Sequence, residues 1–158
     1  MPITAADINK MFRTAKYFDG VLNKASIYWN MLQRKVTLNM LSEVNVTALA
    51  NGKCTAELTL EEEHTNIMGG LHGGLSATLV DCISSYALVS KTSLPHVSVH
   101  INTEYIKGAK LGDQIEIFGN TVKMGKSLAF LEVLIKDKNT GALLVKGSHT
   151  KFLLAPKE

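Results

Sequence analysis

Short segments of alternating hydrophobic and polar residues run through much of the chain, and this alternation predicts β-strands. In the clearest segment one face carries threonine and glutamate, and the other face carries Cys54, Ala56, Leu58 and Leu60. A period of two is typical of a half-buried strand. Residues 36–50 are rich in valine and leucine but alternate unevenly, so we predict a kinked strand there. The pair Asn51-Gly52 favours a tight turn, which predicts that the two strands form an antiparallel hairpin.

Two other segments show the period of a helix. In residues 5–18 the apolar positions are three or four apart, and Thr4 and Asp7 form a typical helix start. We therefore predict an amphipathic N-terminal helix in this segment. Residues 74–89 also have apolar positions three and four apart, and most of their other side chains are small. Asp81 is the only charged residue of this second helix, so we expect the helix to be buried on almost every side.

Four further strand-like segments follow residue 95, with turns between them. No β-α-β alternation occurs along the chain, which favours a mainly antiparallel sheet. We predict an α+β fold in which this sheet wraps around the one long central helix, with the N-terminal helix as an addition. Residues 1–35 are expected to form an N-terminal helical segment and residues 36–158 a single domain. Because the outer face and the edges of such a sheet need cover, we also expect an oligomer.

Composition and charge limit the classes of function. The chain has 158 residues, 46% of them hydrophobic and 20% charged, which excludes general disorder. Its two cysteines cannot form a disulfide framework and favour a reducing compartment, so we expect the cytoplasm or the mitochondrion. No apolar stretch approaches the length of a membrane-spanning helix. The net charge of +3 is too small to indicate nucleic acid, but it would suit a small anionic ligand if the lysines converge.

The segment HTNIMGGLHGGLSATLVD, residues 64–81, combines several features of a chemical site. Gly73 and Gly74 lie where a loop enters the long helix, and the first N–H groups of a helix can bind an anion or an oxyanion. Asn66 can add an amide donor. Asp81 lies about 10 Å further along the helix axis, too far to share one small site with the start of its own helix. A second subunit with an antiparallel helix would bring Asp81 against the partner's Gly73.

Short motifs between residues 52 and 153 extend this pattern over about two thirds of the chain. They are EEEHTN at 61–66, LHGGL at 71–75, ATLVD at 77–81, VSV at 97–99, AKLG at 109–112, GK at 125–126, LAF at 128–130 and HTK at 149–151. The set resembles the hotdog-fold acyl-CoA thioesterases, and in particular their thioesterase superfamily member 2 branch. The resemblance implies the hotdog fold, an antiparallel sheet wrapped around one long helix.

The resemblance also implies an enzyme that hydrolyses acyl-CoA to a free fatty acid and CoA, without a metal or an organic cofactor. In such enzymes the Gly73 backbone N–H polarises the acyl carbonyl, aided by Asn66. Asp81 of the facing subunit acts as a base on the attacking water or as a nucleophile, and Ser98 helps to hold the water. His72, directly before Gly73, completes the candidate catalytic set. The family forms homodimers that pair into homotetramers, which implies that each site is shared between chains.

A CoA site follows from the same resemblance. In the family the CoA arm lies across two segments that match residues 105–110 and 123–128 of this chain. The candidate CoA-binding residues are Tyr105, Lys107, Gly108, Lys110, Lys123, Gly125, Lys126, Ser127 and, from a separate match, Glu62. Four of them are lysines, which supply cations for an anionic nucleotide.

Two other functions fit parts of the same pattern. If Asp81 is only structural, the chain would bind acyl-CoA or a fatty acid without hydrolysing it. If His72 and Asp81 act as a histidine base and an acid, the chain would be a hotdog dehydratase. Free thiol from acyl-CoA distinguishes hydrolysis from both alternatives.

Two further kinds of site have weaker support. His96 and His100 lie on one face of a predicted strand, but only Glu104 is near them in sequence as a further metal ligand. A Ser-His-Asp triad lacks the strand-turn-helix elbow on which such a serine lies. We therefore expect neither a metal site nor a serine hydrolase.

Overall fold

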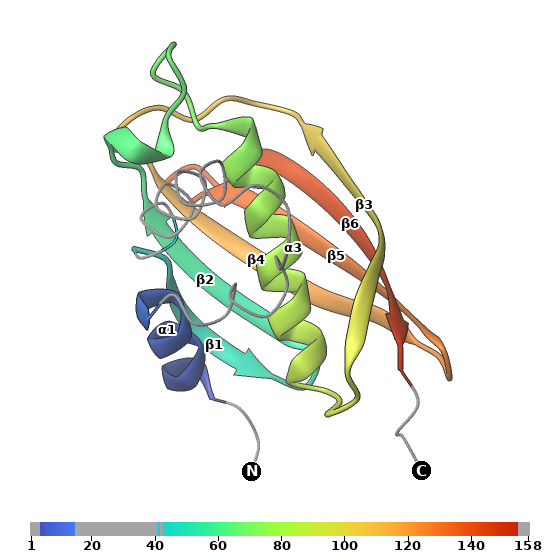
Figure 1. The fold of residues 1–158 in the computed structure, drawn as a ribbon. Helices are drawn as coiled ribbons and strands as arrows, with labels where there is room; N and C mark the ends of the chain where they lie inside the picture. The colour runs from blue at the N-terminus through green and yellow to red at the C-terminus, as the bar shows by residue number, and fades with distance from the viewer. Residues whose placement is uncertain (1–3, 15–40, 42, 155–158) are drawn as a thin grey trace, which may run out of the picture.

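Six strands form one antiparallel sheet in the computed structural model, which describes residues 4–14, 41 and 43–154. The strands are β1 (Asn45–Ala50), β2 (Lys53–Thr59), β3 (His96–Tyr105), β4 (Gln114–Met124), β5 (Leu128–Asp137) and β6 (Leu143–Leu153). Their order across the sheet is β1-β2-β4-β5-β6-β3. The sheet curves around helix α3 (Gly73–Val89), and helix α1 (Ala5–Thr14) lies beside β1 (Figure 1). The predicted α+β fold, with its sheet around one long helix, is confirmed.

The hairpin of β1 and β2 lies where the sequence predicts it. Asn51 and Gly52 have φ angles of 52° and 82°, the left-handed conformation that a two-residue hairpin turn requires. A bulge between Val46 and Ala48 interrupts the register of β1 with β2. Because a bulge bends its strand, it accounts for the uneven alternation at this end of the hairpin.

The strand predicted over residues 36–50 is wrong at residues 41, 43 and 44. Strand β1 begins only at Asn45, and residue 41 is helical. Leu41 and Val44 are buried in the core although neither belongs to a strand, so burial alone explains their apolar character. Residues 36–40 lie outside the described residues.

Helix α1 begins as predicted, with a reciprocal cap. The Asp7 N–H donates to Thr4 Oγ1 (3.2 Å), and the Thr4 N–H donates to Asp7 Oδ2 (2.9 Å). Ile8 is fully buried, and the Asn9 side chain bonds to the main-chain N–H and carbonyl of Val46 (2.8 and 3.2 Å). Helix α1 therefore covers part of the outer edge of β1. The predicted helix end at residue 18 and the domain division at residue 35 lie outside the described residues, so both stay predictions.

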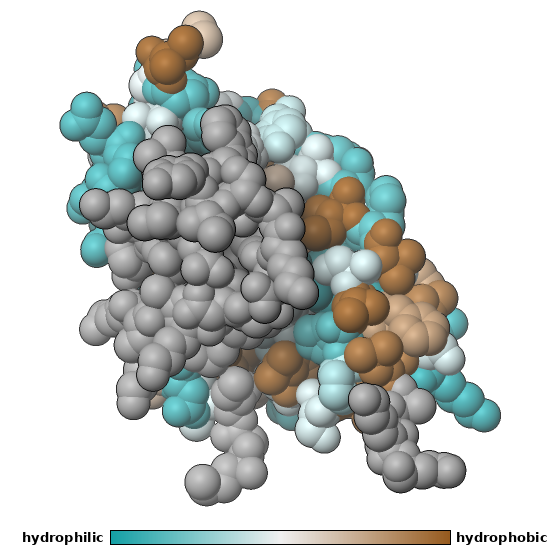
Figure 2. All heavy atoms as spheres, in the orientation of Figure 1, coloured by the Kyte–Doolittle hydropathy of each residue, from teal (hydrophilic) through white to brown (hydrophobic). Residues whose placement is uncertain are grey.

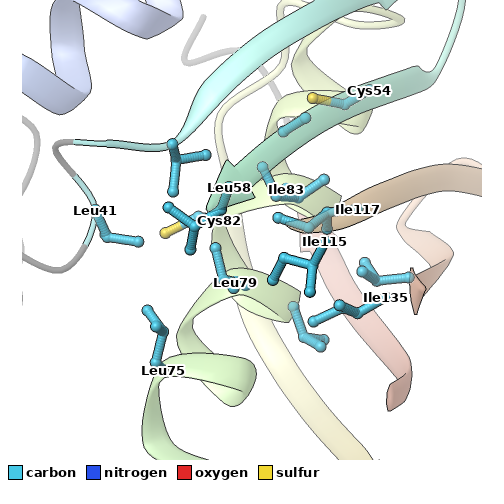
Figure 3. Close-up of a cluster of buried hydrophobic side chains, with 14 of the residues drawn as sticks. Leu41, Cys54, Leu58, Leu75, Leu79, Cys82, Ile83, Ile115, Ile117 and Ile135 are labelled. Carbon is cyan, nitrogen blue, oxygen red and sulfur yellow. The ribbon is translucent and has the colours of Figure 1, made fainter. Parts of the chain in front are cut away.

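Helix α3 packs directly against the sheet. The core between them includes Leu75, Leu79, Ile83, Ile115, Ile117 and Ile135 (Figure 3). A Cβ atom at Gly119 of β4 would lie 2.9 Å from the Ile83 carbonyl oxygen, so this glycine permits the close approach of the helix. Residues 82–88 are all buried, as predicted for a helix covered on almost every side. The helix begins at Gly73, one residue earlier than predicted.

Strand β3 forms an edge of the sheet, and most of its residues are exposed. Val97, Val99 and Ile101 are apolar residues among them. Figure 2 shows hydrophobic side chains along this side of the molecule. An exposed apolar edge strand favours pairing with another chain. The edge supports the expected oligomer, which itself stays a prediction.

Candidate active site

The side chain of Asn66 holds closed the loop between η2 (Glu62–His64) and α3. Its Oδ1 atom accepts the N–H groups of Met68 (2.9 Å) and Gly70 (3.2 Å), and its main-chain N–H donates to the Gly70 carbonyl (2.8 Å). These contacts fix the orientation of the amide, because only its oxygen can accept from N–H groups. The Nδ2 group of Asn66 is left as a donor without an acceptor among the described residues.

The start of α3 presents a second donor. His72 is the N-cap residue, and its Nδ1 atom accepts the Gly74 N–H (3.0 Å). The Tyr105 hydroxyl donates to the Gly73 carbonyl (3.0 Å), and a Cβ atom at Gly73 would lie 3.4 Å from the Tyr105 ring. Within the described ranges the Gly73 N–H has no acceptor. A free N–H at the positive end of a helix dipole, with a free amide on the preceding loop, favours an oxyanion.

Asp81 lies in the middle of α3, where its side chain is 45% exposed. Its Oδ1 atom is 3.8 Å from the ammonium nitrogen of Lys151, which lies on the buried face of β6. Lys151 Nζ also donates to Ser98 Oγ (3.3 Å), and the register of β3 and β6 pairs these two residues directly. Asp81 and Ser98, two members of the predicted catalytic set, are therefore brought together by Lys151.

A buried histidine extends this cluster toward the core. His149 Nε2 is 3.0 Å from Ser98 Oγ, and its Nδ1 is 2.7 Å from Ser84 Oγ. Burial, and then the nearby Lys151 charge, lower the pKa of His149 to about 3, so its 3.8 Å contact with Asp81 is not an ion pair. The single hydroxyl hydrogen of Ser84 goes to a helix carbonyl (2.6 Å), so we assign the ring hydrogen of His149 to Nδ1. Nε2 then accepts the hydroxyl hydrogen of Ser98.

Within one chain, the predicted catalytic residues form two groups that lie apart from each other. Asn66, His72 and Gly73 lie at the helix start, whereas Asp81 and Ser98 lie further along. The eight residues from Gly73 to Asp81 correspond to about 12 Å along the helix axis. A cavity of about 140 Å³ at the ends of β2 and β4 is lined by none of these residues. Because of this distance along the helix, a second subunit is still needed to bring the two groups of residues together.

The candidate CoA-binding residues are also separated within one chain. Lys107 and Lys110 lie in the loop after β3, and Lys123 and Lys126 lie at the end of β4 and the turn that follows it. Figure 1 shows that loop and that turn at opposite ends of the sheet. The remaining candidates are Glu62, Tyr105, Gly108, Gly125 and Ser127, and all nine residues are exposed. One chain alone does not gather the four lysines around a single site.

The structure adds three residues to the candidate site, Lys151, His149 and Ser84, to which the sequence pattern assigns no role. The motif at 149–151 contributed to the resemblance only, and Ser84 counted only as a small residue. A signal was available, because the alternation of β6 places His149 and Lys151 on its buried face. A buried polar side chain needs a partner, and these two residues find theirs on α3 and β3.

Metal-binding clusters and membrane-spanning helices are both absent from the part of the chain that the structure describes. Among the described residues, no group of three His, Cys, Asp or Glu side chains is placed to hold a metal ion. The helices within the same ranges include none long and apolar enough to cross a membrane.

The curved antiparallel sheet and the long helix inside it define a hotdog-fold protein. A family model described as thioesterase superfamily matches residues 68–143. Human acyl-coenzyme A thioesterase 13 is 47% identical over 115 residues, which cover 72% of this chain and 82% of the relative. The mouse protein of the same name is 45% identical over the same shares. The chain belongs to the thioesterase superfamily, which confirms the resemblance that the motifs indicate.

Solved structures agree with this assignment. Zebrafish thioesterase superfamily member 2 matches with a TM-score of 0.78 and 35% identity, over 96% of this chain and 99% of that one. A hypothetical thioesterase from Streptococcus pneumoniae with coenzyme A matches with a TM-score of 0.67 and 25% identity. That match covers 73% of this chain and 91% of the bacterial protein.

Proposed function

We propose that this chain hydrolyses the thioester of acyl-CoA to a free fatty acid and CoA. Its family and its relatives named acyl-coenzyme A thioesterase 13 support this reaction, and a relative at 25% identity was solved with coenzyme A. The observation that carries the proposal is the start of α3, where the Gly73 N–H and the Asn66 Nδ2 group have no acceptor among the described residues. A thioester oxygen gains negative charge as water adds to the carbonyl, and such donors stabilise that charge.

In the proposed reaction Asp81 acts as the general base. The attacking water, held by Ser98, gives a proton to the Asp81 carboxylate while its oxygen bonds to the thioester carbon. The resulting oxyanion accepts from the Gly73 N–H and from Asn66. It collapses by breaking the carbon–sulfur bond, and CoA leaves as a thiolate that takes up the proton held by Asp81, which restores the Asp81 carboxylate. His72 supports the reaction as the cap of the helix start, and no proton transfer in this scheme requires its ring.

We infer that a second chain completes each site, in a homodimer. The distance along α3 supports this arrangement, and so does the partly exposed side chain of Asp81. Ser98 lies on the exposed edge strand β3, so a chain that pairs with this edge lies beside Ser98. The two lysine pairs, at opposite ends of one sheet, can reach one CoA only when they come from different chains of the assembly.

The apolar face of the sheet that continues from the edge of β3 supports the pairing of dimers into a homotetramer. Val97, Phe152 and Leu128 are neighbours across β3, β6 and β5, and all three are exposed. Phe130, also exposed, lies two residues along β5 on the same face. A dimer that forms through the edge of β3 leaves this face of the sheet uncovered, so we infer that it joins two dimers.

The compartment is also a proposal. Cys54 and Cys82 are both free and buried, and thiols of this kind fit a reducing environment. We propose the cytoplasm or the mitochondrion. Fractionation of cells that express the tagged full-length chain would locate it.

The reaction is tested by incubating the purified chain with acyl-CoA of several chain lengths and trapping the free thiol. We expect catalytic thiol release, with one equivalent of free acid for each thiol. Saturable acyl-CoA binding without thiol release would instead indicate a non-catalytic binding protein. Hydration of an enoyl-CoA without thiol release would indicate a hotdog dehydratase.

A further inference from the structure

Lys151 is a lysine in an unusual place, because only 5% of its surface is exposed. Lysine is rarely buried to this extent unless its charge is paired. Its ammonium lies 3.8 Å from Asp81 Oδ1 and 3.3 Å from Ser98 Oγ. Both neighbours belong to the catalytic set of the proposed reaction, so the position of the ammonium bears directly on that reaction.

The other ionisable groups around Lys151 are uncharged at neutral pH or exposed. On α3, burial raises the pKa of the neighbouring Cys82 thiol to about 12. On β6 the pKa of His149 is about 3, and on β3 burial lowers the pKa of His96 below its usual value. His100, also on β3, is exposed. Among these groups Asp81 is therefore the one anion that can pair with the ammonium.

The charge states of Lys151 and His149 determine which group donates and which accepts in each hydrogen bond around Ser98. Lys151 donates to Ser98 Oγ, and the Ser98 hydroxyl hydrogen goes to His149 Nε2. One lone pair of Ser98 Oγ stays free to accept. A water molecule that donates one hydrogen to Asp81 and the other to Ser98 would have its oxygen lone pair free for attack.

We propose that Lys151 is a positioning residue for the thioester hydrolysis, whose ammonium holds the Asp81 carboxylate and the Ser98 hydroxyl in the relative position that orients the attacking water. This inference rests on the proposed acyl-CoA hydrolysis. Lys151 acts through these two groups and is not expected to touch the substrate. Its loss should therefore change kcat and leave KM nearly unchanged.

The first test replaces the charge and retains the length of the side chain. We expect Lys151→Met to lower kcat by about tenfold to a hundredfold, because a misplaced catalytic group loses that much, with KM within about twofold of the original value. The matched control is Lys146→Met on the same strand, since Lys146 lies on the exposed face and only approaches Glu132 (3.9 Å). Equal kcat values for the two variants would overturn the proposal.

A pH profile separates positioning by charge from a merely structural role. Burial lowers the pKa of Lys151, with Asp81 opposing this effect, so the ammonium loses its proton at a lower pH than an ordinary lysine does. We expect kcat of the unmodified protein to fall on the alkaline side, below the usual range of lysine. Lys151→Met should lack this fall and Lys146→Met should retain it. The same alkaline fall in all three proteins would contradict the proposal.

A third measurement stays decisive even if Lys151→Met does not fold. Lysine side chains labelled with ¹³C at Cε are titrated by NMR in the unmodified protein and in Asp81→Asn. Because the carboxylate favours the charged ammonium, the Lys151 signal should titrate at a lower pH in Asp81→Asn. An unchanged titration would overturn the pairing. Absence of thiol release from the unmodified protein would defeat both the proposed function and this inference, whereas normal release with an unchanged titration would defeat the inference alone.

Discussion

The amide of Asn66 divides its two hydrogen-bonding roles between its two ends. Oδ1 closes the loop by accepting the N–H groups of Met68 and Gly70, and Nδ2 has no acceptor in the part of the chain that the structure describes. A carboxylate at this position can still accept both loop N–H groups, but it cannot donate to an oxyanion. Asn66→Asp therefore separates the proposed catalytic role of the side chain from its role in the loop.

We expect Asn66→Asp to lower kcat by about 10²–10³, the usual effect of removing one oxyanion donor, while the melting temperature stays nearly constant. Thiol-release kinetics and thermal unfolding measure the two effects. Asn66→Ala should lose both roles and so reduce activity and the thermal stability of the loop. An Asn66→Asp protein with near-normal kcat would show that the amide does not contact the reacting carbonyl.

His149 predicts how the stability of the fold depends on pH. Its pKa is about 3 in the folded chain, against about 6.5 for histidine in an unfolded chain. As pH falls below 6.5 the unfolded chain binds this proton first, so the stability present above pH 6.5 is lost progressively toward pH 3. We expect a loss of about 2 kcal/mol from this residue between pH 8 and pH 5. Urea unfolding at several pH values measures it.

Two variants isolate the contribution of His149 from that of the carboxylates. His149→Gln should show a weaker pH dependence of the free energy of unfolding, because the titrating group is gone. His100→Gln, at an exposed position of β3, should retain the original dependence. If the His149→Gln curve kept its full slope, the buried histidine would not be the cause.

At the scale of the elements, the position of α3 depends on two glycines of the sheet. A Cβ atom at Gly119 would meet the main chain of Ile83 at 2.9 Å, and one at Gly147 would meet the side chain of Val80 at 2.5 Å. The main-chain contact at Gly119 cannot be relieved by a change of rotamer. Because α3 carries both Gly73 and Asp81, displacement of this helix would disturb both parts of the site.

We expect Gly119→Ala to reduce the free energy of unfolding by about 1–3 kcal/mol, the usual cost of overpacking. Urea unfolding measures this loss. Gly108→Ala is the control for stability, because nothing lies within 4 Å of the added methyl group. Equal stabilities for the two variants would mean that the helix moves away from β4 without penalty.

The elements could be predicted from local patterns, but the cluster around Lys151 could not. Alternation predicts the strands, and the small residues of α3 predict a buried helix, because the burial of a position determines which residue type occupies it. The error at residues 41, 43 and 44 has the same origin, since Leu41 and Val44 are buried outside any strand. Gly73, Asn66 and Asp81 were found because they lie on one continuous segment.

The contacts of His149 join residues that lie far apart in the sequence, and local patterns do not reveal such contacts. Ser84 lies 65 residues before it and Ser98 lies 51 residues before it. They meet because β6 pairs with β3 on one side and faces α3. The alternation of one strand gives the face of each side chain, but not the neighbouring strand or the register.

At the scale of the whole molecule, charge predicts how the substrate binds. Lys107, Lys110, Lys123 and Lys126 are exposed, so their attraction for CoA phosphates should be screened by salt. We expect KM for acyl-CoA to rise with ionic strength. Lys107→Ala and Lys126→Ala should each raise KM more than they lower kcat, because such contacts hold substrate and transition state alike. As a control, Lys53→Ala on β2 should change neither KM nor kcat. A KM that changes neither with salt nor with the substitutions at Lys107 and Lys126 would place the CoA site elsewhere.

The central claim is that the oxyanion donors of one chain act with Asp81 of another. Asp81→Asn should lower kcat at least about a hundredfold with folding and assembly unchanged, because it removes the base. Asn66→Asp should be similarly inactive because it removes one of the oxyanion donors. In a dimer that joins the two variants, one site contains both intact groups and the other contains neither.

The most direct measurement is therefore thiol release after the two inactive chains are unfolded together, refolded and compared with each chain refolded alone. Random pairing makes half of the dimers mixed and restores one site in each, so the account predicts about a quarter of the unmodified activity. The variants refolded separately should stay inactive. A mixture that assembles normally but has no more activity than the separate chains would show that Asp81 and Asn66 act within one chain or not at all.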